Sequence, residues 1–280
     1  MKILMDCDGG RDDALALQLL CRSPHRLLGV STCFGGFPSQ QAAIQAQEIL
    51  QKEGKKIPVC AGANRSLTGE RGPVHSDEAA EWQGSTMAAG RFLSDQLSAC
   101  TDSVTMLATG PLTNVAAMLR STSIRPSRIV VMGGGIHGGN RTKAAEFNFY
   151  CDPEAAKEVL QSGCTITLLP LEAAAACVLT EDSMQSFPPE IQMLMQEQMT
   201  FSLRTGCGSG NGAVLYDAVA AAGLIAPEVF ARTRKCFCTV DCSKHPDAGA
   251  LRITDGDGPI ALVEYADPER FFRLLTALLS

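Results

Sequence analysis

The fold is decided close to the N-terminus, by the stretch Lys2-Ile3-Leu4-Met5-Asp6-Cys7-Asp8-Gly9-Gly10-Arg11-Asp12-Asp13. Its four aspartates lie between an apolar strand and an apolar helix that continues to Cys21. Carboxylates this close repel one another, so a fold of marginal stability needs a counter-charge to keep them together. Carboxylate oxygens suit Ca²⁺ or Mg²⁺, and the two glycines let the backbone turn around an ion. The stretch therefore predicts a site for a hard cation.

Apolar strands and helices alternate outward from that stretch along the chain. Strands are expected at Leu27 to Thr32 and Ile57 to Ala61, separated by a helix from Ser39 to about Lys52. This βαβαβ order indicates an open α/β fold with a mostly parallel sheet, in which ligands bind beyond the carboxyl ends of the strands. With 280 residues, we expect one domain spanning residues 1–280.

Later segments carry weaker signals. Small residues predict a helix from Leu171 to Leu179, and Met193, Met195 and Met199 are expected to pack in a helix from Pro189 to Thr205. The glycine-rich run Gly206 to Gly212 is interpreted as a mobile rim of the ligand site.

Composition narrows the class of partner. The net charge is −6 without a basic cluster, which argues against nucleic acid or an anionic membrane surface as partner. No apolar run approaches the roughly 20 residues that span a bilayer. We therefore expect a cytoplasmic protein that acts on a small molecule.

Twelve cysteines are spread along the chain, many of them inside apolar runs, and are expected to be reduced core thiols. One cluster, Cys236, Cys238, Cys242 and His245, has the donor types that zinc prefers. A strand with Cys236 and Cys238 on one face is the simpler interpretation.

Polar side chains gather after several predicted strands, and nearly all of them bear oxygen or amide groups. They are Asp6, Asp8, Asp12, Asp13, Thr109, Asn140, Glu146, Asn148 and Asp217. They include no Ser/His/Asp arrangement, and the chain has no phosphate loop with a lysine. Such a set suits a neutral polyol held by its hydroxyls, with an ion that activates water.

The N-terminal aspartates resemble the D-x-D-x-x-x-D-D-A signature of the nucleoside hydrolases. Further blocks resemble that family in its own order: Thr109-Gly110-Pro111-Leu112-Thr113-Asn114, Met132-Gly133-Gly134-Gly135, Gly139-Asn140, and Ala145-Glu146-Phe147-Asn148 followed by Asp152-Pro153-Glu154-Ala155-Ala156. They cover roughly residues 1–225, and such a series is far more specific than one short motif.

The resemblance implies a tightly bound Ca²⁺ and hydrolysis of the N-glycosidic bond of ribonucleosides. By position, the ion would be held by Asp8, Asp13, Asp217 and the main-chain carbonyl of Thr109, and Asp8 would also take a proton from the attacking water. The substrate would contact Asp12, Asn140, Glu146, Phe147, Asn148 and Asp217, with Met132 beside the sugar. Relatives are dimers or tetramers, so a homodimer or homotetramer is expected.

Two departures from the usual pattern resemble the purine-specific branch of the family. Gly9 replaces the usual proline, and Tyr216 precedes Asp217 where many members have histidine. Trp82 stands where that branch has a tryptophan, so Trp82 and Tyr216 are expected to sandwich a purine. His75 resembles a family histidine near the base.

Gly36 departs in another way, because the family usually has Asn or Asp there, near the attacking water. One alternative is therefore a relative that binds nucleosides but has impaired catalysis. A second is a haloacid-dehalogenase-like phosphatase, in which Asp6 and Asp8 would serve as nucleophile and acid. That class has no use for Asp12, Asp13 or Glu146.

Overall fold

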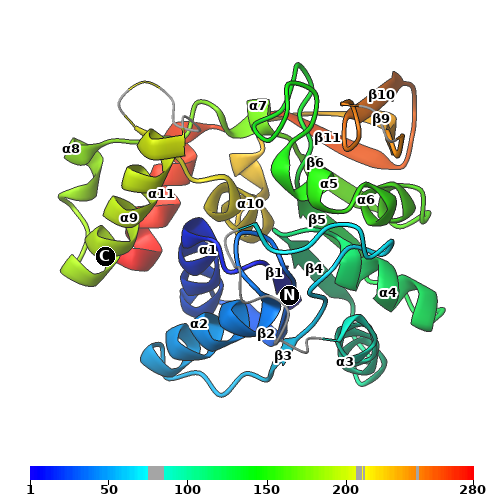
Figure 1. Cartoon of the computed structure of the whole chain (residues 1–280). Coiled ribbons are helices and arrows are strands. Elements are labelled where there is room, and N and C mark those ends of the chain that lie inside the picture. The colour runs from blue at the N-terminus through cyan, green and yellow to red at the C-terminus, as the bar shows by residue number, and fades with distance from the viewer. Residues whose placement is uncertain (75–84, 206–209, 211, 244–245) are drawn as a thin grey trace.

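The computed structural model of the chain describes residues 1–74, 85–205, 210, 212–243 and 246–280 (Figure 1). Its centre is a nine-stranded sheet in the order β10-β9-β11-β6-β5-β4-β1-β2-β3. The strands are β1 (Lys2–Cys7), β2 (Arg26–Thr32), β3 (Val59–Ala61), β4 (Val104–Ala108), β5 (Arg128–Met132), β6 (Ile166–Leu169), β9 (Arg232–Val240), β10 (Leu251–Asp255) and β11 (Ile260–Tyr265). Every neighbouring pair is parallel except the two made by β9. The predicted fold class, an open and mostly parallel α/β sheet, is confirmed.

Helices cover both faces of the sheet (Figure 1). Their apolar side chains form one core with α1, α2, α9, α10 and α11, and a second core on the other face with α3, α4 and α6. The helices are α1 (Arg11–Arg22), α2 (Ser39–Lys52), α3 (Thr86–Ser98), α4 (Thr113–Ser121), α5 (Phe147–Cys151), α6 (Pro153–Leu160), α7 (Leu171–Ala174), α8 (Glu181–Met184), α9 (Pro189–Thr205), α10 (Tyr216–Ile225) and α11 (Pro268–Leu279), with a 3₁₀ turn at Pro227–Val229.

The first strand lies inside the sheet, between β4 and β2. Its apolar run is continuous because both of its faces are covered by helices. The register places Asp6 beside Ala108 of β4 and Ser31 of β2. The loop after β1 therefore emerges next to Thr109, and the residues that follow three parallel strands meet at one edge.

The helix predicted from Leu171 to Leu179 is wrong in its second half. Helix α7 ends at Ala174, and β7 (Val178–Leu179) pairs antiparallel with β8 (Ala213–Val214). Small residues allow a helix without requiring one, and here pairing with a distant segment decides the conformation. Most of the glycine-rich run before β8, residues 206–209 and 211, lies outside the described residues.

Cys236 and Cys238 lie on one face of β9 with their sulfur atoms 3.5 Å apart, and both are buried in the core. The simpler interpretation of the cysteine cluster is therefore confirmed for these two residues. Cys242 Sγ contacts the carbonyl of Val240, and His245 lies outside the described residues.

Among the described residues, none of the helices is both long enough and apolar enough to cross a membrane.

Candidate active site

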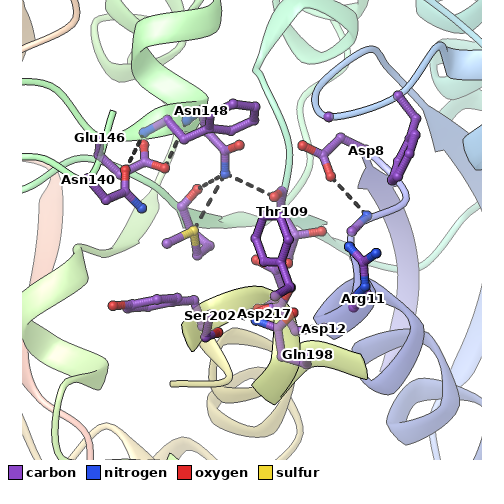
Figure 2. Close-up of a pocket in the computed structure, with 17 residues that line it drawn as sticks. Asp8, Arg11, Asp12, Thr109, Asn140, Glu146, Asn148, Gln198, Ser202 and Asp217 are labelled. Carbon is purple, nitrogen blue, oxygen red and sulfur yellow. Dashed lines mark hydrogen bonds between the residues drawn. The ribbon is translucent and has the colours of Figure 1, made fainter. Parts of the chain in front are cut away.

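A pocket opens at the carboxyl ends of β1, β4 and β5, the edge at which the sequence places its polar residues (Figure 2). Its empty volume is about 950 Å³, part of it open to solvent, which is ample for a molecule the size of a nucleoside. The lining residues are Asp8, Gly10, Arg11, Asp12, Gly36, Phe37, Thr109, Met132, Asn140, Glu146, Phe147, Asn148, Gln198, Phe201, Ser202, Tyr216 and Asp217.

The loop between β1 and α1 brings the aspartates together. Gly9 has a φ of +76°, and a Cβ there would lie 2.6 Å from that of Ala42, so the turn requires glycine. Gly10 N donates to Asp13 Oδ2 at 2.9 Å and to Asp8 Oδ1 at 3.1 Å. The turn thus fixes both carboxylates at the N-terminus of α1, where the partial positive charge of the helix favours them.

The remaining aspartate contacts join three elements. Thr109 Oγ1, after β4, donates to Asp13 Oδ1 at 2.5 Å. The backbone N–H of Asp217 at the start of α10 donates to Asp12 Oδ2 at 3.2 Å. We call Asp8, Asp12, Asp13 and Asp217 the aspartate floor; each of these residues is more than nine-tenths buried.

Burial without a counter-charge raises the pKa of every carboxylate in the aspartate floor. Loss of solvation raises the pKa of Asp13 to about 6, with repulsion from Asp12 adding to it. The pKa values of Asp8 and Asp217 are raised well above the usual range by loss of solvation and by the charges of Asp13 and Asp12, respectively. Each one-unit shift corresponds to about 1.4 kcal/mol, so the ionised floor is destabilising by itself.

The floor fits a hard cation by its chemistry. All of its donors are oxygens, and within the described part of the chain no salt bridge reaches any of the four carboxylates. The carboxylates stand as two neighbouring pairs, Asp8 with Asp13 and Asp12 with Asp217. No group of three His, Cys, Asp or Glu side chains among the described residues is already closed around a single point.

Asp6 lies behind the floor and is fully buried. Its Oδ1 accepts hydrogen bonds from Ser31 Oγ at 2.5 Å and Asn114 Nδ2 at 2.9 Å, whereas its Oδ2 has no partner among the described residues. Burial raises the pKa of Asp6 to about 7, against the opposing effect of these two hydrogen bonds. Asp6 thus ties β1 to β2 and α4 and does not line the pocket.

The opposite side of the pocket, which we call the amide wall, consists of Asn140, Glu146 and Asn148 (Figure 2). Glu146 accepts from three backbone N–H groups: Oε1 from Asn148 at 2.8 Å, and Oε2 from Gly134 at 2.9 Å and Phe149 at 3.1 Å. Burial raises its pKa, and the N–H donors oppose that rise. The glutamate caps α5, so the fold itself fixes its position.

The two asparagines of the wall are also oriented by the backbone. Asn148 Nδ2 donates to the carbonyls of Thr109 at 2.9 Å and Met132 at 3.3 Å. Asn140 Oδ1 accepts from the N–H of Phe147 at 2.9 Å. Side chains held in this way can bind the hydroxyl groups of a ligand without first being ordered.

The structure brings together most of the site residues that the sequence predicts. Asp8, Asp12, Thr109, Met132, Asn140, Glu146, Phe147, Asn148, Tyr216 and Asp217 line the pocket, and Asp13 accepts hydrogen bonds from the lining residues Gly10 and Thr109. His75 and Trp82 lie outside the described residues.

Five further lining residues have no assigned role in the sequence-based site: Arg11, Phe37, Gln198, Phe201 and Ser202. Three of these lie on α9 at spacings of three and four residues, which places them on one helix face. Their spacing is the available signal, but methionines around them favour packing in the core. Arg11 lies inside the decisive N-terminal stretch and is easily overlooked among its aspartates.

Most of the chain is similar in sequence to known proteins. Residues 3–273 match the model of the inosine-uridine preferring nucleoside hydrolases. The pyrimidine-specific ribonucleoside hydrolase RihA of Photobacterium profundum is 36% identical over 82% of this chain and 81% of its own length. RihB of Escherichia coli, also named pyrimidine-specific, is 31% identical over 89% of this chain and 85% of its own length.

Solved structures show the same fold. A plant nucleoside hydrolase, the PpNRh1 enzyme, superposes with a TM-score of 0.87 at 22% identity, over 98% of this chain and 97% of its own. An inosine-guanosine nucleoside hydrolase superposes with a TM-score of 0.83 at 25% identity, over 99% and 98%. The chain therefore belongs to the inosine-uridine preferring nucleoside hydrolase family, whose members hydrolyse the N-glycosidic bond of ribonucleosides.

Proposed function

We propose that this protein hydrolyses ribonucleosides to ribose and free base at this pocket, with Ca²⁺ bound by the aspartate floor. The observation that carries the proposal is a set of buried aspartates without a cationic partner among the described residues, facing a wall of preordered hydrogen-bonding groups. Asp8, Asp13, Asp217 and the main-chain carbonyl of Thr109 would hold the ion. Its charge would make a nearby water more acidic than bulk water.

The aspartate floor and the amide wall would have different roles in the reaction. As the glycosidic bond breaks, positive charge develops on the ribose, and the surrounding carboxylates stabilise that state more than the ground state. Asp8 would accept a proton from the attacking water. Asp12, Asp217 and the amide wall would hold the sugar hydroxyls, with Met132 and Phe147 beside the ring.

We propose a purine as the preferred base. Tyr216 lines the pocket beside Asp217 and offers a ring for stacking, which is worth about 1 to 3 kcal/mol per base. Gly9 in place of the usual proline also supports a purine, because it resembles the purine-specific branch of the family. A pyrimidine is the second candidate, because the relatives RihA and RihB, at 36% and 31% identity, are named pyrimidine-specific.

Release of ribose from a panel of inosine, guanosine, adenosine, uridine and cytidine tests the proposal. We expect release that is lost in Asp8→Ala, with kcat/KM larger for the purines. Larger values for uridine and cytidine would favour the second candidate. Equal activity in Asp8→Ala would contradict the role of Asp8.

The same panel tests the alternative that the protein binds nucleosides but has impaired catalysis because position 36, which lines the pocket, is glycine. Calorimetric binding of inosine without release of hypoxanthine over hours would favour a nucleoside-binding protein. The phosphatase alternative has no support from the family match, since residues 3–273 match nucleoside hydrolases.

A further inference from the structure

Arg11 stands apart from the other charged residues of the pocket. The lining includes four carboxylates, Asp8, Asp12, Glu146 and Asp217, and among the described lining residues Arg11 is the one cation. An arginine stays protonated throughout the range in which enzymes work. The pocket therefore has one fixed positive charge within a strongly negative surrounding.

The guanidinium group is not used to neutralise its neighbours. Within the described residues no ion pair joins its side chain to the aspartate floor, and its carbon Cζ lies 5.0 Å from the ring centroid of Phe201 on α9. Cation–π contact of this kind is worth about 0.5 to 2 kcal/mol and fixes the group in place. No described residue accepts a hydrogen bond from the guanidinium, so its N–H groups can donate to a ligand.

The position of Arg11 is also unfavourable for the helix. It is the first residue of α1, where a positive charge opposes the helix dipole at a cost of roughly 0.3 to 1 kcal/mol. Figure 2 shows Arg11 on the side of the pocket away from Asn140 and Glu146. A ribose held between the amide wall and the aspartate floor would direct its base toward this remaining side.

We propose that Arg11 is a catalytic residue that contacts the departing nucleobase and stabilises the negative charge that develops on it. The inference rests on the proposed function. Charge separates during the reaction, positive on the ribose and negative on the base. In this proposal the carboxylates would surround the sugar, and the guanidinium, backed by Phe201, would lie beside the base.

The bond between C1′ and the base nitrogen breaks with both electrons staying on the nitrogen. The water oxygen forms a bond to C1′, and its proton passes to the Asp8 carboxylate. The guanidinium donates hydrogen bonds to the anionic base without losing a proton, and the base is protonated by solvent after release.

This role of Arg11 is tested by measuring kcat of the Arg11→Met variant on two substrates. Nucleosides have a poor leaving group that needs stabilisation, whereas para-nitrophenyl β-D-ribofuranoside releases an anion that is stable in water. We expect kcat for the best nucleoside to fall on the order of 100-fold, as when one charge-stabilising donor is removed from an active site. The kcat for the nitrophenyl riboside should stay within about twofold of wild type.

Three further variants sharpen the test. Arg11→Lys keeps the charge but loses the planar fork, so partial recovery of nucleoside kcat is expected. Phe201→Leu removes the ring that holds the guanidinium and should lower nucleoside kcat by a smaller factor. Arg204→Met, at an exposed arginine one turn along α9, is the matched control and should behave as wild type. Circular dichroism verifies that each variant folds.

An equal loss on both substrates would overturn the inference, because it would mean that Arg11 acts on the floor or on the sugar. No loss on either substrate would overturn it as well. Wild-type protein that releases ribose from none of the five nucleosides would instead contradict the proposed function. The two failures are therefore distinguishable.

Discussion

The aspartate floor and the amide wall both bury carboxylates, and they stabilise them in different ways. Glu146 on the wall accepts three backbone hydrogen bonds of 2.8, 2.9 and 3.1 Å, so the fold solvates its charge. On the floor, Asp8 lies against Asp13 and Asp217 against Asp12, and loss of solvation together with repulsion within the pairs raises the pKa of Asp8 and of Asp217. The carboxylate of the wall is hydrogen-bonded by the backbone, whereas those of the floor have no cationic partner among the described residues. This difference supports a cation on the floor and neutral hydroxyl groups at the wall.

The largest expected effect is on catalysis at the floor. Asp8→Asn keeps the shape but removes the proton acceptor, and we expect kcat to fall about 1000-fold, equivalent to roughly 4 kcal/mol in the barrier. Steady-state ribose release measures it. Asp102→Asn, which affects only an exposed ion pair with Lys2, is the control. A fall in kcat of less than tenfold in Asp8→Asn would show that Asp8 is not the proton acceptor.

Removal of calcium should destabilise the protein through the floor. With calcium at about 100 times its Kd, the bound ion contributes about 3 kcal/mol, so chelation should lower Tm by roughly 5 to 10 °C. Thermal unfolding with and without chelator measures this. Asp217→Asn should abolish the shift and make the calcium-free protein more stable, since it removes a repelling charge. A Tm unaffected by calcium in wild type would mean that the floor is stable alone.

A mutation in the amide wall should lower the free energy of unfolding by the same amount with and without calcium. Glu146→Gln replaces a carboxylate oxygen by an amide group that cannot accept from the backbone N–H groups, at an expected cost of about 2 kcal/mol in the free energy of unfolding. Urea unfolding should give the same loss in calcium and in chelator. Glu158→Gln, in a partly exposed pair with Arg120, should cost less than about 1 kcal/mol. A loss from Glu146→Gln seen only with calcium would show that the two sides are one unit.

The smallest effect is expected where the backbone approaches the floor. A Cβ at Gly35 would lie 2.0 Å from Asp8 Oδ2, so Gly35→Ala must displace the carboxylate. We expect about 1.5 kcal/mol of destabilisation and weaker calcium binding. Urea unfolding and calcium titration check both. Unchanged calcium affinity would indicate that Asp8 has room to move.

Much of the floor and the wall could be predicted because their residues fall in short motifs at the ends of apolar strands. Parallel strands bring such ends together, so Asp8, Thr109 and Met132 meet for topological reasons that the alternation of strands and helices already contains. The fold class follows from the same alternation.

The parts that could not be predicted depend on contacts between distant segments. Val178 belongs to a strand because Val214 pairs with it, and no local signal marks that pairing. Phe201 reaches the pocket because α9 packs against α1, and its neighbours along the helix resemble core residues. Arg11 is prominent in the sequence, but only the position of Phe201 shows where its charge lies.

The most direct test of the central claim is isothermal titration of chelator-treated protein with calcium chloride. We expect about one Ca²⁺ per chain in wild type and a roughly tenfold weaker affinity in Asp13→Asn, with wild-type affinity retained in Glu146→Gln. Absence of calcium binding in folded wild-type protein, or equal affinity in Asp13→Asn, would contradict a cation on the aspartate floor.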